Sequence, residues 1–165
     1  ANKCIEGLPG VAFVLVAKGT SLRRRSVYFD LETTLTKQAA EDTPFTPAIQ
    51  VMAAFEAALD ELKHETVAGR LQRYTRAARL LRKALRDLGL DLLLPQANRS
   101  NTITCAQLPD GVDYEQIHER MRGQGYVLYA GQGNLRKTAF RVSNMGQIST
   151  ESLGRFGPAL ERAIS

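Results

Sequence analysis

An apolar stripe along residues 67–88 constrains the fold of this chain more than any other pattern in its sequence. The residues of the stripe recur at alternating spacings of four and three positions: Val67, Leu71, Tyr74, Ala78, Leu81, Leu85 and Leu88. Such spacing aligns side chains on one face of an α-helix, with the intervening arginines beside that face. Gly89 follows at the position where a glycine commonly ends a helix. The sequence therefore predicts one long amphipathic helix that ends at Gly89.

A second helix is predicted just before this one. Thr46 is its expected N-cap, and Pro47 takes the first helical position, where the missing N–H of proline costs nothing. Apolar residues continue at helical spacing to about Lys63. Upstream, residues 28–31 are expected to form a short extended piece, and residues 33–46, rich in Thr, Gln, Glu and Asp, a loop.

A continuous apolar run at residues 11–17 follows the turn-forming triplet Leu8-Pro9-Gly10. A run of this length without alternation is typical of a strand that is buried on both faces in an α/β sheet. Such a strand needs covering helices and neighbouring strands, and this chain supplies them only in part.

A smaller unit is predicted beyond Gly89. Strand patterns occur at residues 90–94, 102–107, 126–129 and 139–142. Helix patterns follow Asp113, which is a candidate cap, and either Ser149 or Thr150. This order predicts an α/β sandwich, with a layer of helices against a small, mostly antiparallel sheet.

Composition excludes several classes of protein. The 165 residues, 44% of them hydrophobic and 24% charged, are typical of one ordinary globular domain. No apolar run is long enough to span a membrane, and the first residues lack the charged and apolar blocks of a signal peptide, so a cytoplasmic location is expected. Cys4 and Cys105 have no nearby histidines at ligand spacing, which predicts neither a disulfide framework nor a metal site.

The net charge of +5 leaves nucleic-acid binding open as an alternative. A basic cluster lies at residues 23–25, and further arginines recur along residues 70–86. A solvated helix face explains those arginines better, because no RNA-binding aromatic signature or zinc-finger spacing accompanies them.

The first ten residues, Ala-Asn-Lys-Cys-Ile-Glu-Gly-Leu-Pro-Gly, set one lysine among small and turn-forming residues directly before the apolar run. This segment resembles the one around the cofactor-bearing lysine of the class V, fold-type I pyridoxal-phosphate aminotransferases, and most closely that of the 2-aminoethylphosphonate:pyruvate transaminases. Lys3 would then be the catalytic lysine that holds pyridoxal 5'-phosphate. Such a lysine needs a site that lowers its pKa, because a protonated amine is a poor nucleophile.

The resemblance continues in order along nearly the whole chain. It includes Ser26-Val27-Tyr28-Phe29-Asp30-Leu31, Phe45-Thr46, Arg73-Tyr74, Leu88-Gly89, residues 125–131 and Phe140-Arg141-Val142-Ser143-Asn144-Met145-Gly146. It implies that Thr46 binds the cofactor phosphate, in the family as a residue supplied by the neighbouring subunit of a homodimer. It also implies that Arg141 binds the anionic end of the substrate, since a guanidinium can hold a phosphonate or carboxylate with two parallel hydrogen bonds.

Two positions depart from the pattern of the family. Ala130 stands where a proline is usual, and Ser143 where a glycine is common. Both lie near the inferred substrate end, so they weaken the assignment of a particular substrate. Cys105 suggests the cysteine desulfurases of the same superfamily, although a cysteine in an apolar strand pattern is more often buried.

The resemblance implies that the chain is the C-terminal part of a transaminase that moves an amino group from 2-aminoethylphosphonate to pyruvate. Its expected organisation is the end of the large cofactor-binding domain at residues 1–46, linking helices at 47–88, and a small α/β domain at 89–165. The ring-stacking aromatic residue and the carboxylate that faces the pyridine nitrogen are expected upstream of Ala1, so the chain alone is expected to be inactive. Two alternatives remain: another class V aminotransferase, such as an alanine:glyoxylate or serine:pyruvate enzyme, and a basic nucleic-acid or protein-binding module.

Overall fold

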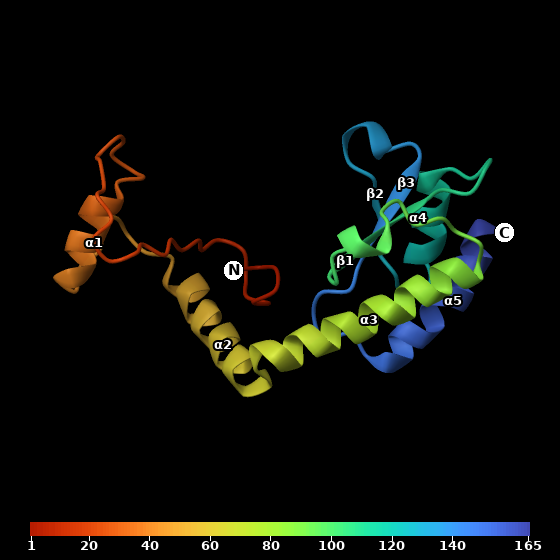
Figure 1. Cartoon of the computed structure of the whole chain (residues 1–165), viewed down its shortest axis with the longest axis horizontal. Helices are drawn as coiled ribbons and strands as arrows, with labels where there is room; N and C mark the ends of the chain where they lie inside the picture. The colour runs from red at the N-terminus through yellow and green to blue at the C-terminus, as the bar shows by residue number, and fades with distance from the viewer. The chain divides into compact units, whose positions relative to one another are not determined.

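Helix α3, Val67–Asp87, is the longest element in the computed structural model, which describes residues 1–165 (Figure 1). It is the amphipathic helix predicted from the apolar stripe, and it buries Tyr74, Ala77, Ala78, Leu81 and Leu85. Gly89 has a φ of 74°, its N–H donates to the carbonyl of Arg86, and the N–H of Leu90 donates to that of Leu85. This is the Schellman arrangement, which needs a residue that tolerates positive φ.

Helix α3 is preceded by α2, Ile49–Glu65, and Thr66 alone separates the two. Thr66 adopts a φ of 69°, a strained conformation for a β-branched residue. Its side-chain oxygen accepts a hydrogen bond of 3.0 Å from the N–H of Gly69 and so caps α3. Two helices were predicted here, and Thr66, in its left-handed conformation, is the residue that separates them.

Three short strands form one antiparallel sheet in the order β1-β3-β2: β1 is Ile103–Gln107, β2 is Tyr129–Ala130 and β3 is Ala139–Ser143. Strands β1 and β3 confirm two of the predicted strands. Of residues 90–94, only Leu92 makes an isolated bridge, to Ala106, so a full strand there was a wrong prediction. Residues 126–129 reach the sheet only at Tyr129, since the chain joins β3 for just two residues.

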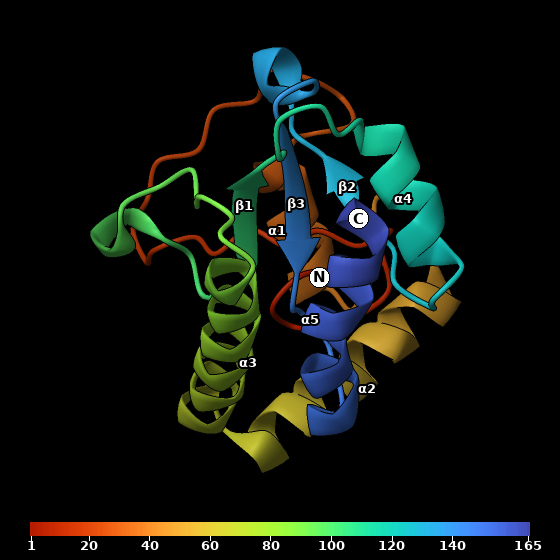
Figure 2. The same cartoon turned by 90° about the vertical axis from the view of Figure 1, so that its right-hand side faces the viewer.

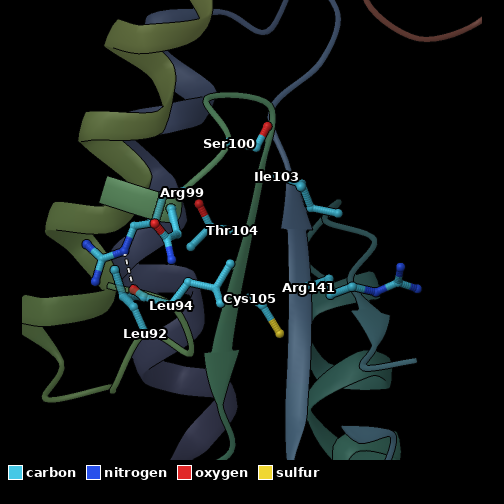
Figure 3. Close-up of a pocket in the computed structure, with 9 residues that line it drawn as sticks. Leu92, Leu94, Arg99, Ser100, Ile103, Thr104, Cys105 and Arg141 are labelled. Atoms are coloured by element: carbon cyan, nitrogen blue, oxygen red, sulfur yellow. Dashed lines mark hydrogen bonds between the residues drawn. The ribbon is translucent and has the colours of Figure 1, made fainter. Parts of the chain in front are cut away.

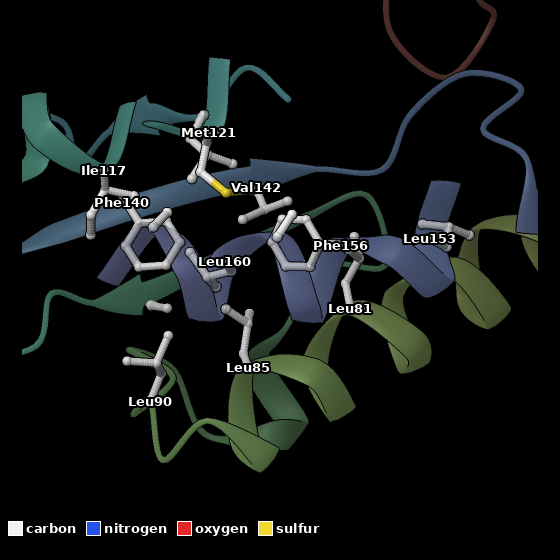
Figure 4. Packing of buried hydrophobic residues seen from close by; sticks show 14 of the residues in the cluster. Leu81, Leu85, Leu90, Ile117, Met121, Phe140, Val142, Leu153, Phe156 and Leu160 are labelled. Carbon is white, nitrogen blue, oxygen red and sulfur yellow. The ribbon is translucent and has the colours of Figure 1, made fainter. Parts of the chain in front are cut away.

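Helices α4, Tyr114–Arg122, and α5, Thr150–Ile164, pack together, and α5 also lies beside α3 (Figure 2). Ser149 confirms its predicted cap, because its hydroxyl accepts from the N–H of Ser152. Asp113 occupies the predicted N-cap position of α4, but its side chain makes no capping hydrogen bond. Apolar side chains of these helices meet the sheet in one core, with Phe140 of β3 and Phe156 of α5 fully buried in it (Figure 4). This confirms the predicted α/β layering.

The chain divides into two compact units, Ala1–Glu61 and Leu62–Ser165, and the core just described belongs to the second. In the first, helix α1 spans Leu31–Ala39, where a loop had been predicted. Asp30 accounts for the helix, because its carboxylate accepts hydrogen bonds from the N–H groups of Glu32 and Thr33 and from the Thr33 hydroxyl. The hydroxyl bond is the main reason that the pKa of the buried Asp30 lies below its ordinary value.

The predicted buried strand at residues 11–17 is not formed, and these residues are neither helix nor strand. Phe13 is 53% exposed and Leu15 is 88% exposed. The physical reason is that a strand is stabilised by pairing, and no strand of the first unit is available to pair with it. One side chain of this segment still makes a packing contact: the ring of Phe13 stacks on Phe55 of α2, with 5.6 Å between the ring centroids.

Helix α2 begins at Ile49, so the prediction that Thr46 is its N-cap and Pro47 its first residue was wrong by two positions. The N–H of Met52 donates to the carbonyl of Ala48, which places Ala48 at the cap position. Thr46 lies exposed in the segment that leads into the helix. None of the helices in the structure combines the length and the apolar character that a membrane span requires.

Candidate functional site

Lys3 lies at the start of a tight turn in the first unit. Its carbonyl oxygen accepts a hydrogen bond of 2.9 Å from the N–H of Glu6, and the N–H of Gly7 donates to the carbonyl of Ala1 at 3.0 Å. Glu6 adopts a φ of 66°, a conformation that non-glycine residues rarely take. The doubled turn leaves the side chain of Lys3 exposed. A primary amine is thus available at the surface of this unit.

Thr46 belongs to the same unit and is also exposed, three residues before the first residue of α2. The first N–H groups of any helix lack partners within it, and together with a nearby hydroxyl they favour a phosphate group. Lys3 and Thr46 therefore supply groups suited to two parts of pyridoxal phosphate: an amine for its carbonyl carbon and a hydroxyl for its phosphate. The residues present fit this cofactor to that extent.

Arg141 lies in the second unit, at the centre of β3. Its register partners are Cys105 on β1 and Tyr129 on β2, so the three side chains share one face of the sheet. The Nε–H of Arg141 donates a hydrogen bond of 2.8 Å to the carbonyl oxygen of Ala130. This bond fixes the direction of the guanidinium, and because the donor is Nε it leaves the terminal N–H groups available.

A cavity of about 170 Å³ opens on the same face of the sheet, with mainly apolar walls. Its lining consists of Leu92, Leu94, Asn98, Arg99, Ser100, Ile103, Thr104, Cys105 and Arg141. Figure 3 shows the guanidinium of Arg141 extending away from Leu92 and Leu94. An anion held by Arg141 would thus lie on the β2 side of β3, outside the apolar part of the cavity.

Cys105 is half-buried between β1 and β3. Burial raises the pKa of its thiol, and the nearby positive charge of Arg141 opposes that shift only in part. A thiol with a raised pKa is mostly protonated and is a weak nucleophile. This disfavours the role of Cys105 as a desulfurase nucleophile and agrees with the prediction that it is a packing residue.

Close packing requires a glycine at position 131, and the sequence alone did not predict this. A Cβ atom at this position would lie 2.3 Å from the carbonyl oxygen of Leu135, in the 3-10 turn Gly133–Leu135. The N–H of Gly131 donates to the carbonyl of Ala139 at 2.8 Å. The Gly131-Gln132-Gly133 pattern thus serves close packing next to the Arg141 strand, and only its glycines gave a signal.

Asn144 is a second residue that sequence reasoning missed. It is 1% exposed, and its side-chain amide donates to the carbonyls of Asn101, at 2.8 Å, and Tyr74, at 3.3 Å. Its own N–H donates to the carbonyl of Thr102. Asn144 thereby ties the end of β3 to α3 and to the start of β1, three residues after Arg141. Its place in the Phe140–Gly146 motif was the available signal.

Of the three predicted site residues, Lys3 and Thr46 lie in one compact unit and Arg141 in the other.

Known proteins resemble this chain in sequence along nearly its whole length. No protein-family model matches the chain. A 2-aminoethylphosphonate–pyruvate transaminase of Vibrio cholerae is 34% identical over 99% of the chain, and one of Syntrophobacter fumaroxidans is 33% identical over 99%. The chain spans about half the length of these relatives, 47% and 46%, and corresponds to the C-terminal part.

Solved structures agree with the sequence relatives. An aspartate aminotransferase of Thermus thermophilus matches 86% of the chain with a TM-score of 0.77 and 29% identity, and the match covers 41% of that protein. An alanine–glyoxylate aminotransferase of Nostoc sp. matches 87% with a TM-score of 0.77 and 30% identity, over 40% of its length. The fold is that of the C-terminal region of a fold-type I, class V aminotransferase. In sequence the chain is similar to 2-aminoethylphosphonate–pyruvate transaminases, which confirms the predicted resemblance.

Proposed function

We propose that this chain is the C-terminal half of an aminotransferase that transfers the amino group of 2-aminoethylphosphonate to pyruvate, giving phosphonoacetaldehyde and alanine. The observation that carries the proposal is the similarity to relatives of that name over 99% of the chain. The residues that the resemblance singles out are chemically suited to the reaction, and the structure leaves Lys3 and Thr46 exposed.

Lys3 and Thr46 are proposed to hold pyridoxal phosphate, which when bound supplies the electron sink for transamination. The Nζ of Lys3 would have two roles: it would hold the cofactor between turnovers, and as a free amine it would accept a proton from the carbon that bears the substrate amino group. The hydroxyl of Thr46, supplied by the neighbouring subunit of a homodimer, would donate to the phosphate. We assign residues 1–46 to the end of a large domain, 47–88 to linking helices and 89–165 to a small domain. The association of two such subunits into a homodimer stays a prediction.

Arg141 is proposed to orient the substrate by its anionic group. The bond from its Nε to Ala130 leaves terminal N–H groups for two parallel hydrogen bonds with a phosphonate or, in the other half-reaction, a carboxylate. Lysine offers a point charge without that geometry. The departure at Ala130 does not disturb the contact, because the acceptor is the backbone carbonyl, which a proline would also provide.

The test is the formation of alanine from 2-aminoethylphosphonate and pyruvate by the full-length protein that contains this chain. Lys3→Ala is expected to abolish turnover and the visible absorbance of the lysine-bound cofactor, whereas Lys18→Ala, a control at another exposed lysine, leaves both unchanged. Arg141→Lys is expected to raise KM for both substrates about tenfold or more. The 165-residue chain alone is expected to be inactive, because it spans under half of its relatives. Full activity of the isolated chain or of Lys3→Ala would refute the proposal.

A second candidate function is the transfer of an amino group between other small substrates, as in an alanine:glyoxylate enzyme. The Nostoc structure, whose name states that activity, supports it, and so do the departures at Ala130 and Ser143. A panel of amino donors decides between the two: turnover with alanine and glyoxylate, without turnover of 2-aminoethylphosphonate, would favour the second. A nucleic-acid module is less favoured, because Arg70 and Arg73 of α3 are both paired with Glu65 at 2.6 Å.

A further inference from the structure

A groove of about 340 Å³ lies between α3 and residues 96–101 of the second unit, and Arg99 is the one residue that it shares with the cavity lined by Arg141. Its lining consists of Thr75, Ala78, Arg79, Arg82, Arg86, Gln96, Arg99 and Asn101. Four of these residues are arginines and none is acidic. A concave surface with this concentration of one charge attracts ions of the opposite sign.

Three of the arginines come from one face of α3, at positions i, i+3 and i+7, and the fourth comes from the end of the 3-10 turn Gln96–Asn98. Arg82 is held in place, because its Nε–H donates to the Thr104 hydroxyl at 3.0 Å and its Nη2 to the carbonyl of Ser100. The Nε–H of Arg99 donates to the carbonyl of Leu94 at 2.6 Å (Figure 3). Each of these two guanidiniums keeps further N–H donors.

Arg79 and Arg86 are exposed and form no salt bridge. The acidic residues at the two ends of this helix pair with residues outside the groove. Asp87, at its C-terminal end, pairs with Lys83 at 2.5 Å, and Glu65, just before its start, pairs with Arg70 and Arg73. The positive charge of the groove is therefore uncompensated within the second unit. Burial first, and then the charges of Arg99 and Arg86, lower the pKa of Arg82, as expected where like charges are held close together.

We propose that this groove is a binding site for a small polyanion that carries two or more phosphate or phosphonate groups. Positions 79 and 86 are about 10 Å apart along a helix at 1.5 Å per residue, farther than one phosphate group reaches. A linked pair of phosphates can contact both ends of the groove while the fixed guanidiniums of Arg82 and Arg99 hold its middle. Guanidinium suits this role because it binds phosphate oxygens through paired N–H groups. Arg141 does not line the groove, so this site is distinct from the proposed substrate anchor.

The experiment is isothermal titration of the 165-residue chain with pyrophosphate, tripolyphosphate and orthophosphate at about 0.15 M salt, the physiological ionic strength. The proposal expects one saturable site for pyrophosphate and tripolyphosphate and at least tenfold weaker binding of orthophosphate. Arg79→Gln and Arg86→Gln should each weaken tripolyphosphate binding about tenfold, the typical effect of losing a charge-assisted hydrogen bond. Arg86→Lys should restore only part of the affinity.

Arg76→Gln is the matched control, because Arg76 is an exposed arginine of the same helix that does not line the groove. Its affinity should stay within twofold of the parent chain. Equal weakening by Arg76→Gln and Arg86→Gln would show a diffuse positive surface and overturn the proposal. So would the absence of saturable binding, or a single-stranded oligonucleotide that displaces tripolyphosphate with an affinity that rises with its length, since that result would identify a nucleic-acid surface.

Discussion

The two compact units of this chain treat their apolar residues in opposite ways. In residues 62–165 the apolar faces of α3, α4 and α5 and one face of the sheet meet in a continuous core, in which Phe156 is 1% exposed. In residues 1–61 the only buried residues are Asp30 and Ala58, and large apolar side chains such as Leu15 are exposed. Hydrophobic sequence alone does not bury a segment, because burial needs a complementary surface.

The comparison also shows what stabilises a small unit that lacks a core. The first unit relies on local devices: the Asp30 cap, an ion pair of 3.1 Å between Asp30 and Arg24, and the Phe13–Phe55 stack. Each of these is a local contact that buries little apolar surface. The second unit has caps of the same kind and a packed core in addition, so we expect it to dominate the measured stability of the chain.

A large contrast is expected between two phenylalanines. Phe156→Ala removes a fully buried ring and is expected to lower the free energy of unfolding by about 3–5 kcal/mol, while Phe13→Ala, at a half-exposed ring, costs about 1 kcal/mol or less. Urea unfolding followed by circular dichroism measures both. If Phe156→Ala does not fold, Phe156→Leu, expected to cost about 1.5 kcal/mol or less, replaces it. Equal losses at positions 13 and 156 would contradict the contrast between the units.

A smaller loss is expected from Asn144→Asp in the second unit. The substitution replaces two N–H donors by an oxygen that faces the carbonyls of Asn101 and Tyr74, so the unfolding free energy should fall by about 1–3 kcal/mol. The same change at the exposed Asn134 is the control and should cost less than about 0.5 kcal/mol. Urea denaturation of both variants provides the comparison, and equal effects would show that the buried amide contributes little.

Acid should weaken the second unit through Glu65. The hydrogen bond from Arg73, assisted by Arg70, lowers the pKa of Glu65 from 4.5 to about 2. A lowered pKa in the folded state stabilises the protein above the ordinary pKa, and that contribution disappears as the pH falls from about 4.5 through about 2. In thermal melts between pH 6 and pH 2, the parent is expected to lose this contribution as the pH falls, whereas Glu65→Gln, less stable than the parent at pH 6, should lack that acid-dependent step. Parallel pH profiles would exclude Glu65 as a contributor.

The smallest effect is expected from Leu15→Lys in the first unit. Because Leu15 is 88% exposed, the charge costs no burial, and the unfolding free energy should change by less than about 0.5 kcal/mol. Leu85→Lys, at a fully buried position of α3, is the matched opposite and should prevent folding of the second unit. Marked destabilisation by Leu15→Lys would show that residues 11–17 are covered in solution.

The sequence predicted best those elements whose signals are local. The stripe of α3 and its end at Gly89, strands β1 and β3, and the Ser149 cap all depend on residues within a few positions of one another. The strand expected at residues 11–17 failed because pairing depends on strands that are distant in sequence or outside the chain. Helix α1 was missed although Asp30, followed by Thr33, was a readable cap signal.

The candidate site was predictable to a different degree at each residue. Lys3, Thr46 and Arg141 came from resemblance, and nothing in their spacing indicated a common function. The sequence could show that Arg79, Arg82 and Arg86 share a helix face, but Arg99 joins them only because the chain returns to α3 after Gly89. Contacts of this kind follow from tertiary packing, which periodicity does not encode.

The bond between Arg141 and the carbonyl of Ala130 has a consequence for protein engineering. Since the main chain holds the guanidinium, the side chain at position 130 can be changed without releasing Arg141, whereas position 131 tolerates only glycine. A library at position 130 would vary the shape of the surface beside a fixed positive charge. Under the proposed role of Arg141 as substrate anchor, that single position is a natural place to select for new preferences among anionic substrates.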